Sequence, residues 1–269
     1  MRDWTRLTAA LWLLAATLTA STAAPATEKR SLMVPMRDGV KLATDEYLPA
    51  TNGAFPALFG RSPYQKALLT GAGQDGARRG YAIVIQNTRG RLGSEGDNLP
   101  FEADGWDGKW DGYDTVERIV HQPWCNGKIG TFGGSAGAIT QLLLAGSGNT
   151  NVISQHLTVG GPSLYFDVVY GGGILRKALV EDWLRITGFS PEALKLWVAH
   201  PDYDNYWRAR ELTHRYDKIN AAAVHVGGYF DLFAQGTIDA FVGYQKQGEV
   251  TANVDRGGID LVEIGRAHV

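Results

Sequence analysis

Short apolar runs alternate with segments of helical periodicity along most of this chain. Apolar runs bounded by glycine, proline or arginine are typical of strands buried inside a sheet. Residues 111–121 and 136–145 instead carry apolar side chains at helical spacing. Short buried strands that alternate with helices predict an α/β fold, in which helices cover both faces of a mostly parallel sheet. The predicted strands are residues 54–60, 81–86, 128–132, 157–159, 222–226 and 258–262.

Two segments depart from this alternation. Residues 31–49 alternate apolar and polar positions around Asp38-Gly39, which predicts a β-hairpin. Residues 163–220 show helical periodicity, many aromatic residues and no strand-like run. Because an insertion between two strands would lie over the C-terminal edge of the sheet, where α/β folds bind ligands, we expect a helical cap there. The predicted cap helices are residues 174–186, 191–200 and 206–216.

The N-terminal segment has the pattern of a secretory signal peptide. Arg2 and Arg6 precede an apolar run over residues 7–20, and small residues follow through Ala24. This order of a basic region, an apolar core and a small-residue zone predicts a signal peptide over residues 1–24. The alternatives are an uncleaved anchor and a buried helix. We therefore expect a secreted or periplasmic protein without a membrane anchor after cleavage.

The last seven residues, 263–269, match the peptide that a common sequencing-adapter oligonucleotide encodes in frame. We interpret this segment as an adapter artefact and leave it out of the fold prediction. A genuine tail that matches by chance is the alternative. On the first interpretation, native coding ends near Val262 and the chain is a fragment, with its folded domain over residues 31–262.

Composition and charge narrow the function classes. Lysine and arginine number 26 against 28 aspartate and glutamate, and the net charge of −2 argues against a nucleic-acid-binding protein. Contents of 44% hydrophobic and 20% charged residues exclude general disorder. The single cysteine, Cys125, can form neither an intrachain disulfide nor a zinc site alone. No histidine pair has metal-ligand spacing with a third ligand nearby, so we predict no metal and no cofactor, and the oligomeric state stays open.

The strongest chemical signal is a G-x-S-x-G motif at residues 133–137. It lies between the predicted strand 128–132 and the predicted helix 136–145. In this context the glycines allow a strained turn from which the Ser135 hydroxyl projects as a nucleophile. The N–H of Ala136, at the start of the helix, can then face a developing oxyanion. The alternative is a glycine-rich turn with an incidental serine.

A nucleophilic serine needs a histidine base and an acid that orients this base. In hydrolases with this serine motif, the chain order is serine, acid, histidine. Asp231 follows the predicted strand 222–226 and is the candidate acid, although it could also cap the helix that follows. Only His268 lies beyond Asp231, and it belongs to the adapter-like tail, so we assign no base.

These segments and others together resemble the family of cocaine esterase and Xaa-Pro dipeptidyl-peptidase, serine hydrolases with an α/β-hydrolase core. The resemblance extends from about Val34 to Val262. Its motifs are residues 36–42 (MRDGVKL), 61–64 (RSPY), 89–96 (RGRLGSEG), 111–114 (DGYD), 122–128 (QPWCNGK), 133–137 (GGSAG), 200–204 (HPDYD) and 227–231 (GGYFD).

The resemblance implies further roles. Ser135 and Asp231 match the family's nucleophile and acid, and Tyr64 matches the tyrosine whose hydroxyl, with the Ala136 N–H, stabilises the oxyanion. A packed aromatic is the alternative for Tyr64. The family's base lies in a Gly-Pro-Trp-x-His stretch after the next strand, which here would follow Val262. Full-length members also carry a C-terminal jelly-roll domain, which nothing in this sequence could encode.

Departures from the family pattern argue against substrates that carry a free α-ammonium group. Related α-amino-acid ester hydrolases bind a substrate ammonium with carboxylates just after the catalytic aspartate. Phe233 and Ala234 occupy that stretch here, and an apolar pair does not stabilise a cation. Ala136, Ala138 and Asn87 also differ from the residues common in the family, without removal of a catalytic group.

Two further signals have a structural and a functional interpretation. The acidic run 102–114 could bind a cation, but we interpret it as a solvated loop packed by tryptophan. Aromatic residues of the cap could line an acyl pocket, but their helical spacing predicts that most are core. These aromatic residues are Tyr165, Phe166, Tyr170, Trp183 and Trp197.

The sequence therefore predicts an exported serine hydrolase that cleaves ester or amide bonds of small molecules or short peptides through an acyl-enzyme on Ser135. A proline-specific dipeptidyl-peptidase and a non-catalytic binding protein on a hydrolase scaffold are the alternatives. Without a base or the jelly-roll domain, we expect the 269-residue fragment itself to be nearly inactive.

Overall fold

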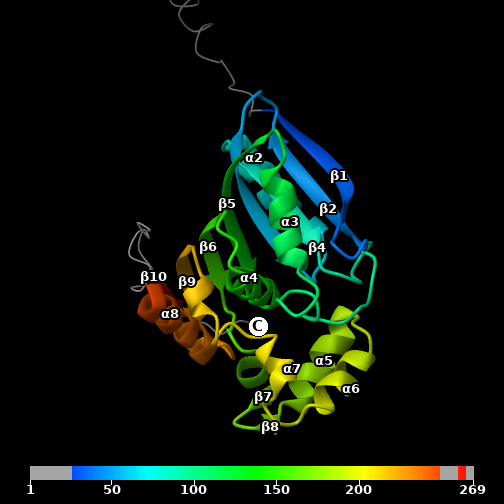
Figure 1. The fold of residues 1–269 in the computed structure, drawn as a ribbon, viewed down its shortest axis with the longest axis vertical. Coiled ribbons are helices and arrows are strands. Elements are labelled where there is room, and N and C mark those ends of the chain that lie inside the picture. Colours follow the sequence, from blue (N-terminus) through cyan, green and yellow to red (C-terminus); the bar gives the residue numbers. More distant parts are fainter. Residues whose placement is uncertain (1–25, 249–259, 265–269) are drawn as a thin grey trace, which may run out of the picture.

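The computed structural model describes residues 26–248 and 260–264, which form one eight-stranded sheet with helices on its faces (Figure 1). The strands are β1 (Thr27–Pro35), β2 (Lys41–Pro49), β3 (Phe55–Ser62), β4 (Ala82–Asn87), β5 (Cys125–Gly134), β6 (Val152–Thr158), β9 (Ala222–Gly228) and β10 (Asp260–Ile264). Their order in the sheet is β1-β2-β4-β3-β5-β6-β9-β10. β1 pairs antiparallel with β2, and β2 pairs antiparallel with β4. All other neighbours are parallel, in agreement with the predicted class.

Helices cover both faces of this sheet, and this explains the apolar run of β4 over residues 82–85. Ala82 and Val84 face the core under one set of helices, whereas Ile83 and Ile85 pack on the opposite face with Ala77. Every residue of β4 is therefore buried. The helices between and after the strands are η1 (Lys66–Leu69, 3₁₀), α2 (Thr70–Arg78), α3 (Asp111–Val120), α4 (Ala136–Gly146) and α8 (Ala234–Gly248).

Between β6 and β9 the chain forms a cap, residues 164–218, which lies beyond one end of the sheet (Figure 1). Its aromatic residues pack on one another, for example Tyr165 against Tyr170 and Trp207. The elements of the cap are η2 (Leu164–Val169, a π-helix), β7 (Tyr170–Gly171), β8 (Ile174–Leu175), α5 (Lys177–Thr187), α6 (Glu192–Val198), α7 (Asn205–Arg208) and η3 (Tyr216–Lys218, 3₁₀).

The predicted helix over residues 206–216 is wrong. The α-helix α7 ends at Arg208 and the 3₁₀ helix η3 begins only at Tyr216, because the backbone between them bonds to the segment that enters the cap. Leu212 N–H donates to the Pro162 carbonyl at 2.7 Å, and Ser163 forms a bridge with Glu211. The Glu211 side chain is buried and accepts a hydrogen bond from Ser163 Oγ at 2.8 Å, so tertiary contacts override the helical spacing.

The sequence prediction also missed η1, α2 and the short β7–β8 pair within the cap, and other elements differ at their ends. β6 starts at Val152 rather than at residue 157, and a register shift against β5 interrupts its early part. β10 pairs parallel with β9 through Ile264, two residues into the adapter-like segment. The predicted signal peptide and His268 lie outside the described residues.

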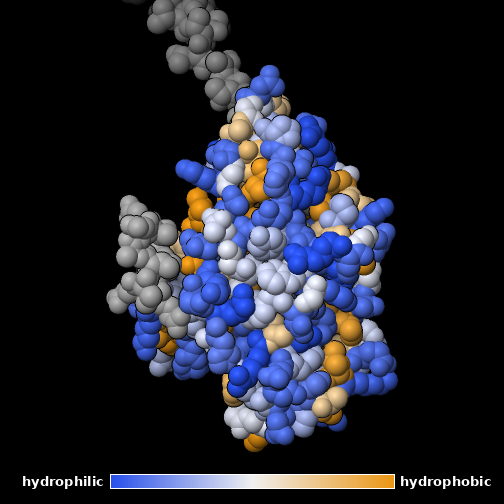
Figure 2. Space-filling view, in the orientation of Figure 1, coloured by the Kyte–Doolittle hydropathy of each residue, from blue (hydrophilic) through white to orange (hydrophobic). Residues whose placement is uncertain are grey.

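On the face shown in Figure 2 the surface is mainly hydrophilic, and apolar residues form small separate patches. Within residues 26–248 and 260–264, no helix combines the length and apolarity that crossing a bilayer requires.

Candidate active site

Ser135 lies on a tight turn between β5 and α4. Its φ of 55° and ψ of −126° are values that residues with a side chain rarely adopt. The Ser135 N–H donates to the Thr158 carbonyl at 3.0 Å, and the Ser135 carbonyl accepts from the Ala138 N–H at 2.9 Å. Both the neighbouring strand and the following helix therefore hold the turn at the C-terminal edge of the sheet.

A close approach between β5 and α4 makes this turn possible. A Cβ added at Gly133 would lie 2.3 Å from the carbonyl oxygen of Gly137, which is far inside van der Waals contact. Every residue of α4 is buried, so the helix cannot move away from the sheet. Glycine at position 133 is therefore required by packing as well as by the sequence motif.

Two hydrogen-bond donors lie beside Ser135. Tyr64 follows β3, and its hydroxyl lies 3.3 Å from Ser135 Oγ. A hydrogen bond of 3.1 Å from the Tyr64 N–H to Ser62 Oγ fixes the backbone of this segment. Ala136 is the first residue of α4, where backbone N–H groups have no acceptor within the helix. The structure thus brings together the two oxyanion donors that the sequence predicts.

A cavity of about 240 Å³ opens next to the Ser135 hydroxyl. Its wall is contributed by α4, the cap and the loop after β9. Among the described residues, no charged side chain lines it. The apolar lining includes Phe101, Ile139, Val168, Leu179, Trp183 and Phe233.

The aromatic residues of the cap divide between this cavity and the core. Trp183 lines the cavity and stacks on Phe101, with ring centroids 6.0 Å apart. Tyr165, Tyr170 and Trp197 are instead buried within the cap, and the Phe166 side chain is 50% exposed. Most of the five residues are therefore core, and Trp183 is the one that lines the cavity.

Asp231 lies in the loop between β9 and α8, and 7% of its surface is exposed. Its Oδ1 accepts a hydrogen bond of 2.7 Å from the Phe233 N–H, so the carboxylate also holds the entry to α8. Phe233 in turn lines the cavity. The candidate acid and the candidate acyl site are therefore linked through one short loop.

No histidine in the described part of the chain forms a hydrogen bond with Ser135. His225, on β9, packs its ring against Tyr244 with centroids 4.8 Å apart, and burial lowers the pKa of His225 to about 4. His200 and His214 bond within the cap, to Asp204 and Tyr203. The remaining two, on β6 and after α3, are His156 and His121.

A buried ion network lies beside the site, and it corrects our interpretation of the acidic run as a solvated loop. The guanidinium of Arg61, on β3, is 1% exposed and pairs with both Asp104 and Asp111. Arg89 contacts Asp111 at 2.6 Å and Asp38 at 2.7 Å. The sequence shows the charges but not their pairing, because the partners come from distant segments.

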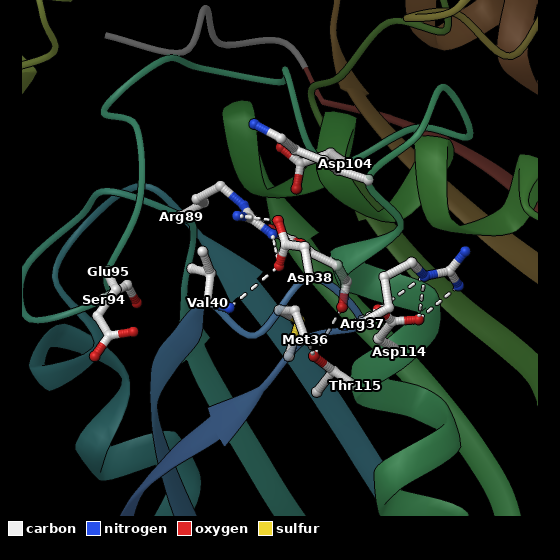
Figure 3. Close-up of polar contacts among 12 residues, drawn as sticks. Met36, Arg37, Asp38, Val40, Arg89, Ser94, Glu95, Asp104, Asp114 and Thr115 are labelled. Carbon is white, nitrogen blue, oxygen red and sulfur yellow. Dashed lines mark hydrogen bonds and ion pairs between the residues drawn. The ribbon is translucent and has the colours of Figure 1, made fainter.

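Figure 3 shows how this network reaches the hairpin turn between β1 and β2. Asp38 faces Arg89, while Arg37 forms an ion pair of 2.6 Å with Asp114 on α3. The carbonyl of Arg61 accepts a hydrogen bond of 2.8 Å from Thr140 Oγ1 on α4. The network therefore connects the turn, the end of β3 and the helix that begins at the Ser135 turn.

The acidic run offers no cation site in this arrangement. Throughout the residues that the structure describes, no group of three histidine, cysteine, aspartate or glutamate side chains could hold a metal ion.

Comparison with known proteins identifies the family. A sequence profile of the X-Pro dipeptidyl-peptidase (S15) family matches residues 38–192 and 188–258. The chain belongs to this family. The predicted resemblance is thereby confirmed.

Individual relatives agree with this assignment. The chain is 30% identical over 264 residues to cocaine esterase from a Rhodococcus species, a match that covers 79% of this chain and 45% of the esterase. An aminopeptidase from a Thaumarchaeota archaeon superposes with a TM-score of 0.70 at 21% identity, over 94% of this chain and 50% of that one. A CocE/NonD family hydrolase from Staphylococcus aureus gives 0.68 at 23% identity, over 88% and 46%.

These comparisons confirm the predicted α/β-hydrolase fold and agree with the predicted class of serine hydrolase. The chain spans about half the length of the relatives that it matches. The roles of Ser135, Asp231, Tyr64 and Ala136 stay predictions that the geometry supports.

Proposed function

We propose that this protein is a serine hydrolase that cleaves ester or amide bonds of small molecules through an acyl-enzyme on Ser135. One observation carries the proposal. Ser135 Oγ stands on a strained turn, 3.3 Å from the Tyr64 hydroxyl, at the wall of an apolar cavity.

In this mechanism, Ser135 Oγ attacks the carbonyl carbon of the substrate while a histidine takes the serine proton. The Tyr64 hydroxyl and the Ala136 N–H stabilise the negative charge on the former carbonyl oxygen. The histidine then protonates the leaving alcohol or amine, and water hydrolyses the acyl-enzyme to release an acid and regenerate Ser135. The family resemblance puts this histidine after β10, beyond the described residues.

The cavity favours an uncharged, apolar acyl group. Since its described lining holds no charged side chain, an α-ammonium group bound there would lose its water without a counter-charge. Phe233, two residues after Asp231, forms part of this wall. This argues for simple acyl esters or amides over amino-acid esters and dipeptides with a free N-terminus.

A non-catalytic binding protein is the second candidate, and one observation favours it. No histidine among the described residues forms a hydrogen bond with Ser135, and without a base the serine is a weak nucleophile. The first experiment therefore has to separate these two functions.

The experiment uses protein expressed from the complete reading frame that contains this sequence. We expect a fluorophosphonate probe to label it at Ser135 and to inhibit hydrolysis of 4-nitrophenyl butyrate, because only an activated serine reacts quickly. Ser135→Ala is expected to abolish both signals, whereas Ser154→Ala, which changes an exposed serine of β6, should leave both intact. Absence of labelling in the parent protein would favour the binding protein.

The same protein decides the substrate class. We expect 4-nitrophenyl butyrate to be hydrolysed with a higher kcat/KM than an Ala-Pro 4-nitroanilide or a phenylglycine methyl ester. The reverse order would assign the protein to the dipeptidyl-peptidase or amino-ester class.

We also propose that the protein is exported, on the basis of the signal-peptide pattern in residues 1–24. N-terminal sequencing of the mature protein should find a start shortly after Ala24. A mature chain that retains residues 1–24 would contradict export by cleavage.

A further inference from the structure

The cap contributes one polar contact to the oxyanion donor. Trp183, on α5, directs its indole Nε1–H to the Tyr64 hydroxyl oxygen at 3.2 Å. The same hydroxyl lies 3.3 Å from Ser135 Oγ. The three side chains thus form a chain that runs from the cap to the nucleophile.

Chemistry fixes the direction of the hydrogen bond between Trp183 and Tyr64. An indole N–H can only donate, so the Tyr64 oxygen must accept from Trp183. The phenol keeps its single proton for a second partner, and Ser135 Oγ is the partner within reach. A hydroxyl that already accepts one hydrogen bond is also the stronger donor in the next.

Trp183 is held in this orientation by aromatic contacts on two sides. It stacks on Phe101 with an interplanar angle of 5°, and its ring centroid lies 5.1 Å from that of Phe189. Phe101 has a positive φ of 65°, so the loop that presents it is itself constrained. Rotation of the indole away from Tyr64 would break both ring contacts.

Arg91 ties the two ends of the Trp183–Tyr64 contact together. Its Nε donates to the Pro63 carbonyl, directly before Tyr64, at 3.1 Å. Its Nη1 donates to the Gly188 carbonyl at 2.7 Å, and Nη2 donates to the Thr187 carbonyl. These carbonyls end α5, the helix that carries Trp183, and they are the negative end of its dipole.

The arginine has few other partners for its charge. Its side chain is buried, and no carboxylate in the described ranges forms an ion pair with it. Its guanidinium also lies over the Phe189 ring at 4.5 Å. The buried Arg91 guanidinium therefore holds the Pro63 segment and the end of α5 together through hydrogen bonds to carbonyls of both.

We infer that Trp183 is a positioning residue of this hydrolase: its indole N–H orients the Tyr64 hydroxyl toward the oxyanion, and Arg91 holds the cap in the place where it can do so. The inference rests on the proposed function. It means that a correctly seated cap completes the oxyanion site in addition to enclosing the acyl group.

The kinetic test is a double-mutant cycle with Trp183→Phe, Tyr64→Phe and the double variant, in the complete protein. Phenylalanine keeps an aromatic ring and removes the N–H together with part of the indole, and the Tyr64→Phe background separates loss of the hydrogen bond from loss of volume. We expect Trp183→Phe to lower kcat for 4-nitrophenyl butyrate about 3- to 10-fold, the worth of one neutral hydrogen bond, with KM within about twofold. Tyr64→Phe is expected to cost about 10²-fold. In the Tyr64→Phe background, Trp183→Phe should have no further effect on kcat.

Trp207→Phe is the matched control, because it removes another indole N–H of the cap, one that donates to the His200 carbonyl at 2.9 Å. It should lower thermal stability and leave kcat unchanged. If Trp183→Phe lowers kcat equally in both backgrounds, or not at all, the inference is overturned.

A second readout does not depend on catalysis. In protein labelled with ¹⁵N-tryptophan, the indole N–H resonance that Trp183→Phe removes should shift upfield in Tyr64→Phe and stay in place in Tyr170→Phe. Tyr170 also lies in the cap, but its hydroxyl donates to the Trp197 carbonyl instead. An unmoved resonance in Tyr64→Phe would overturn the contact. If the parent protein showed no Ser135-dependent turnover, the proposed function and the positioning role would both fall, while a shifted resonance would still establish the contact.

Discussion

At the scale of single residues, backbone strain gathers around the nucleophile. Among the described residues, the non-glycine positions with positive φ are Leu92, Phe101, Ser135 and Val159. Phe101 lines the cavity, and Val159 directly follows the β6 residue that holds Ser135. Such conformations cost of order 1–3 kcal/mol each and persist only where the surroundings impose them.

This strain predicts a difference between two inactive variants. Ser135→Gly relieves the φ of 55°, whereas Ser135→Ala retains it. We expect the free energy of unfolding of Ser135→Gly to exceed that of Ser135→Ala by about 1 kcal/mol, after the entropic cost of glycine is subtracted. Urea denaturation of the pair measures this difference. Equal stabilities, or a more stable alanine variant, would show that the turn is relaxed.

Residues of the site differ in how far the sequence revealed them. Ser135 and Ala136 were predictable because strand, turn and helix adjoin in the chain, so a local pattern specifies them. Asp231 was predictable from its place after a strand and from the order serine, acid, histidine, whereas the role of Tyr64 depended on the family resemblance. Trp183 lay among several cap aromatics with the same spacing. Arg91 lies in the motif of residues 89–96, but nothing local reveals its acceptors, which lie far along the chain.

At the scale of elements, the site depends on how closely α4 approaches β5. The contact between Gly133 and Gly137 leaves no room for a side chain, and α4 is buried along its whole length. The close packing of β5, the Ser135 turn and α4 therefore requires that residue 133 has no Cβ.

Gly133→Ala should reveal this constraint. Its Cβ would meet backbone at 2.3 Å, so we expect a loss of about 3 kcal/mol or more in unfolding free energy, or failure to fold. Gly71→Ala, in α2, is the matched control, since nothing lies within 4 Å of its Cβ. It should gain about 0.5–1 kcal/mol. Thermal unfolding of both variants measures the contrast, and a Gly133→Ala protein as stable as the parent would contradict it.

The same scale shows why strands were predicted better than the cap. β4 is buried on both faces, so its apolar run is unambiguous. In the cap, the helical spacing over residues 206–216 competes with a hydrogen bond from Leu212 to the Pro162 carbonyl and one from Ser163 to Glu211, and these bonds prevail. Hydrogen-bond partners that lie some fifty positions earlier in the chain cannot be recognised from the spacing of neighbouring residues.

At the scale of the whole molecule, the ion network of Arg61, Arg89, Asp38, Asp104 and Asp111 joins the N-terminal hairpin to the edge that carries the site. Its members lie in the hairpin turn, in β3, in the loop after β4 and at the start of α3. Burial raises the pKa of Asp104. The same burial means that an unpaired charge in this network would lower the stability of the fold.

Asp111→Asn should therefore destabilise the whole fold. Asp111 is fully buried and contacts both arginines, so loss of its charge leaves two buried cations undercompensated. We expect a loss of about 3–5 kcal/mol in unfolding free energy. Asp75→Asn, which breaks a surface pair with Arg79, is the control and should cost less than about 1 kcal/mol. Similar losses for the two variants in urea denaturation would exclude a special role for the network.

The insertion point of the cap has an evolutionary consequence. The segments that enter and leave the cap lie side by side: the Leu212 N–H donates to the Pro162 carbonyl at 2.7 Å, and Ser163 bridges Glu211, although most of the cap separates them in the chain. An insertion whose two ends lie side by side can be replaced or lengthened without disturbing the domain into which it is inserted. Substrate range can therefore diversify by replacement of this one module. Any replacement inherits a docking requirement, however: it has to bring an indole to Tyr64 and a helix end to Arg91.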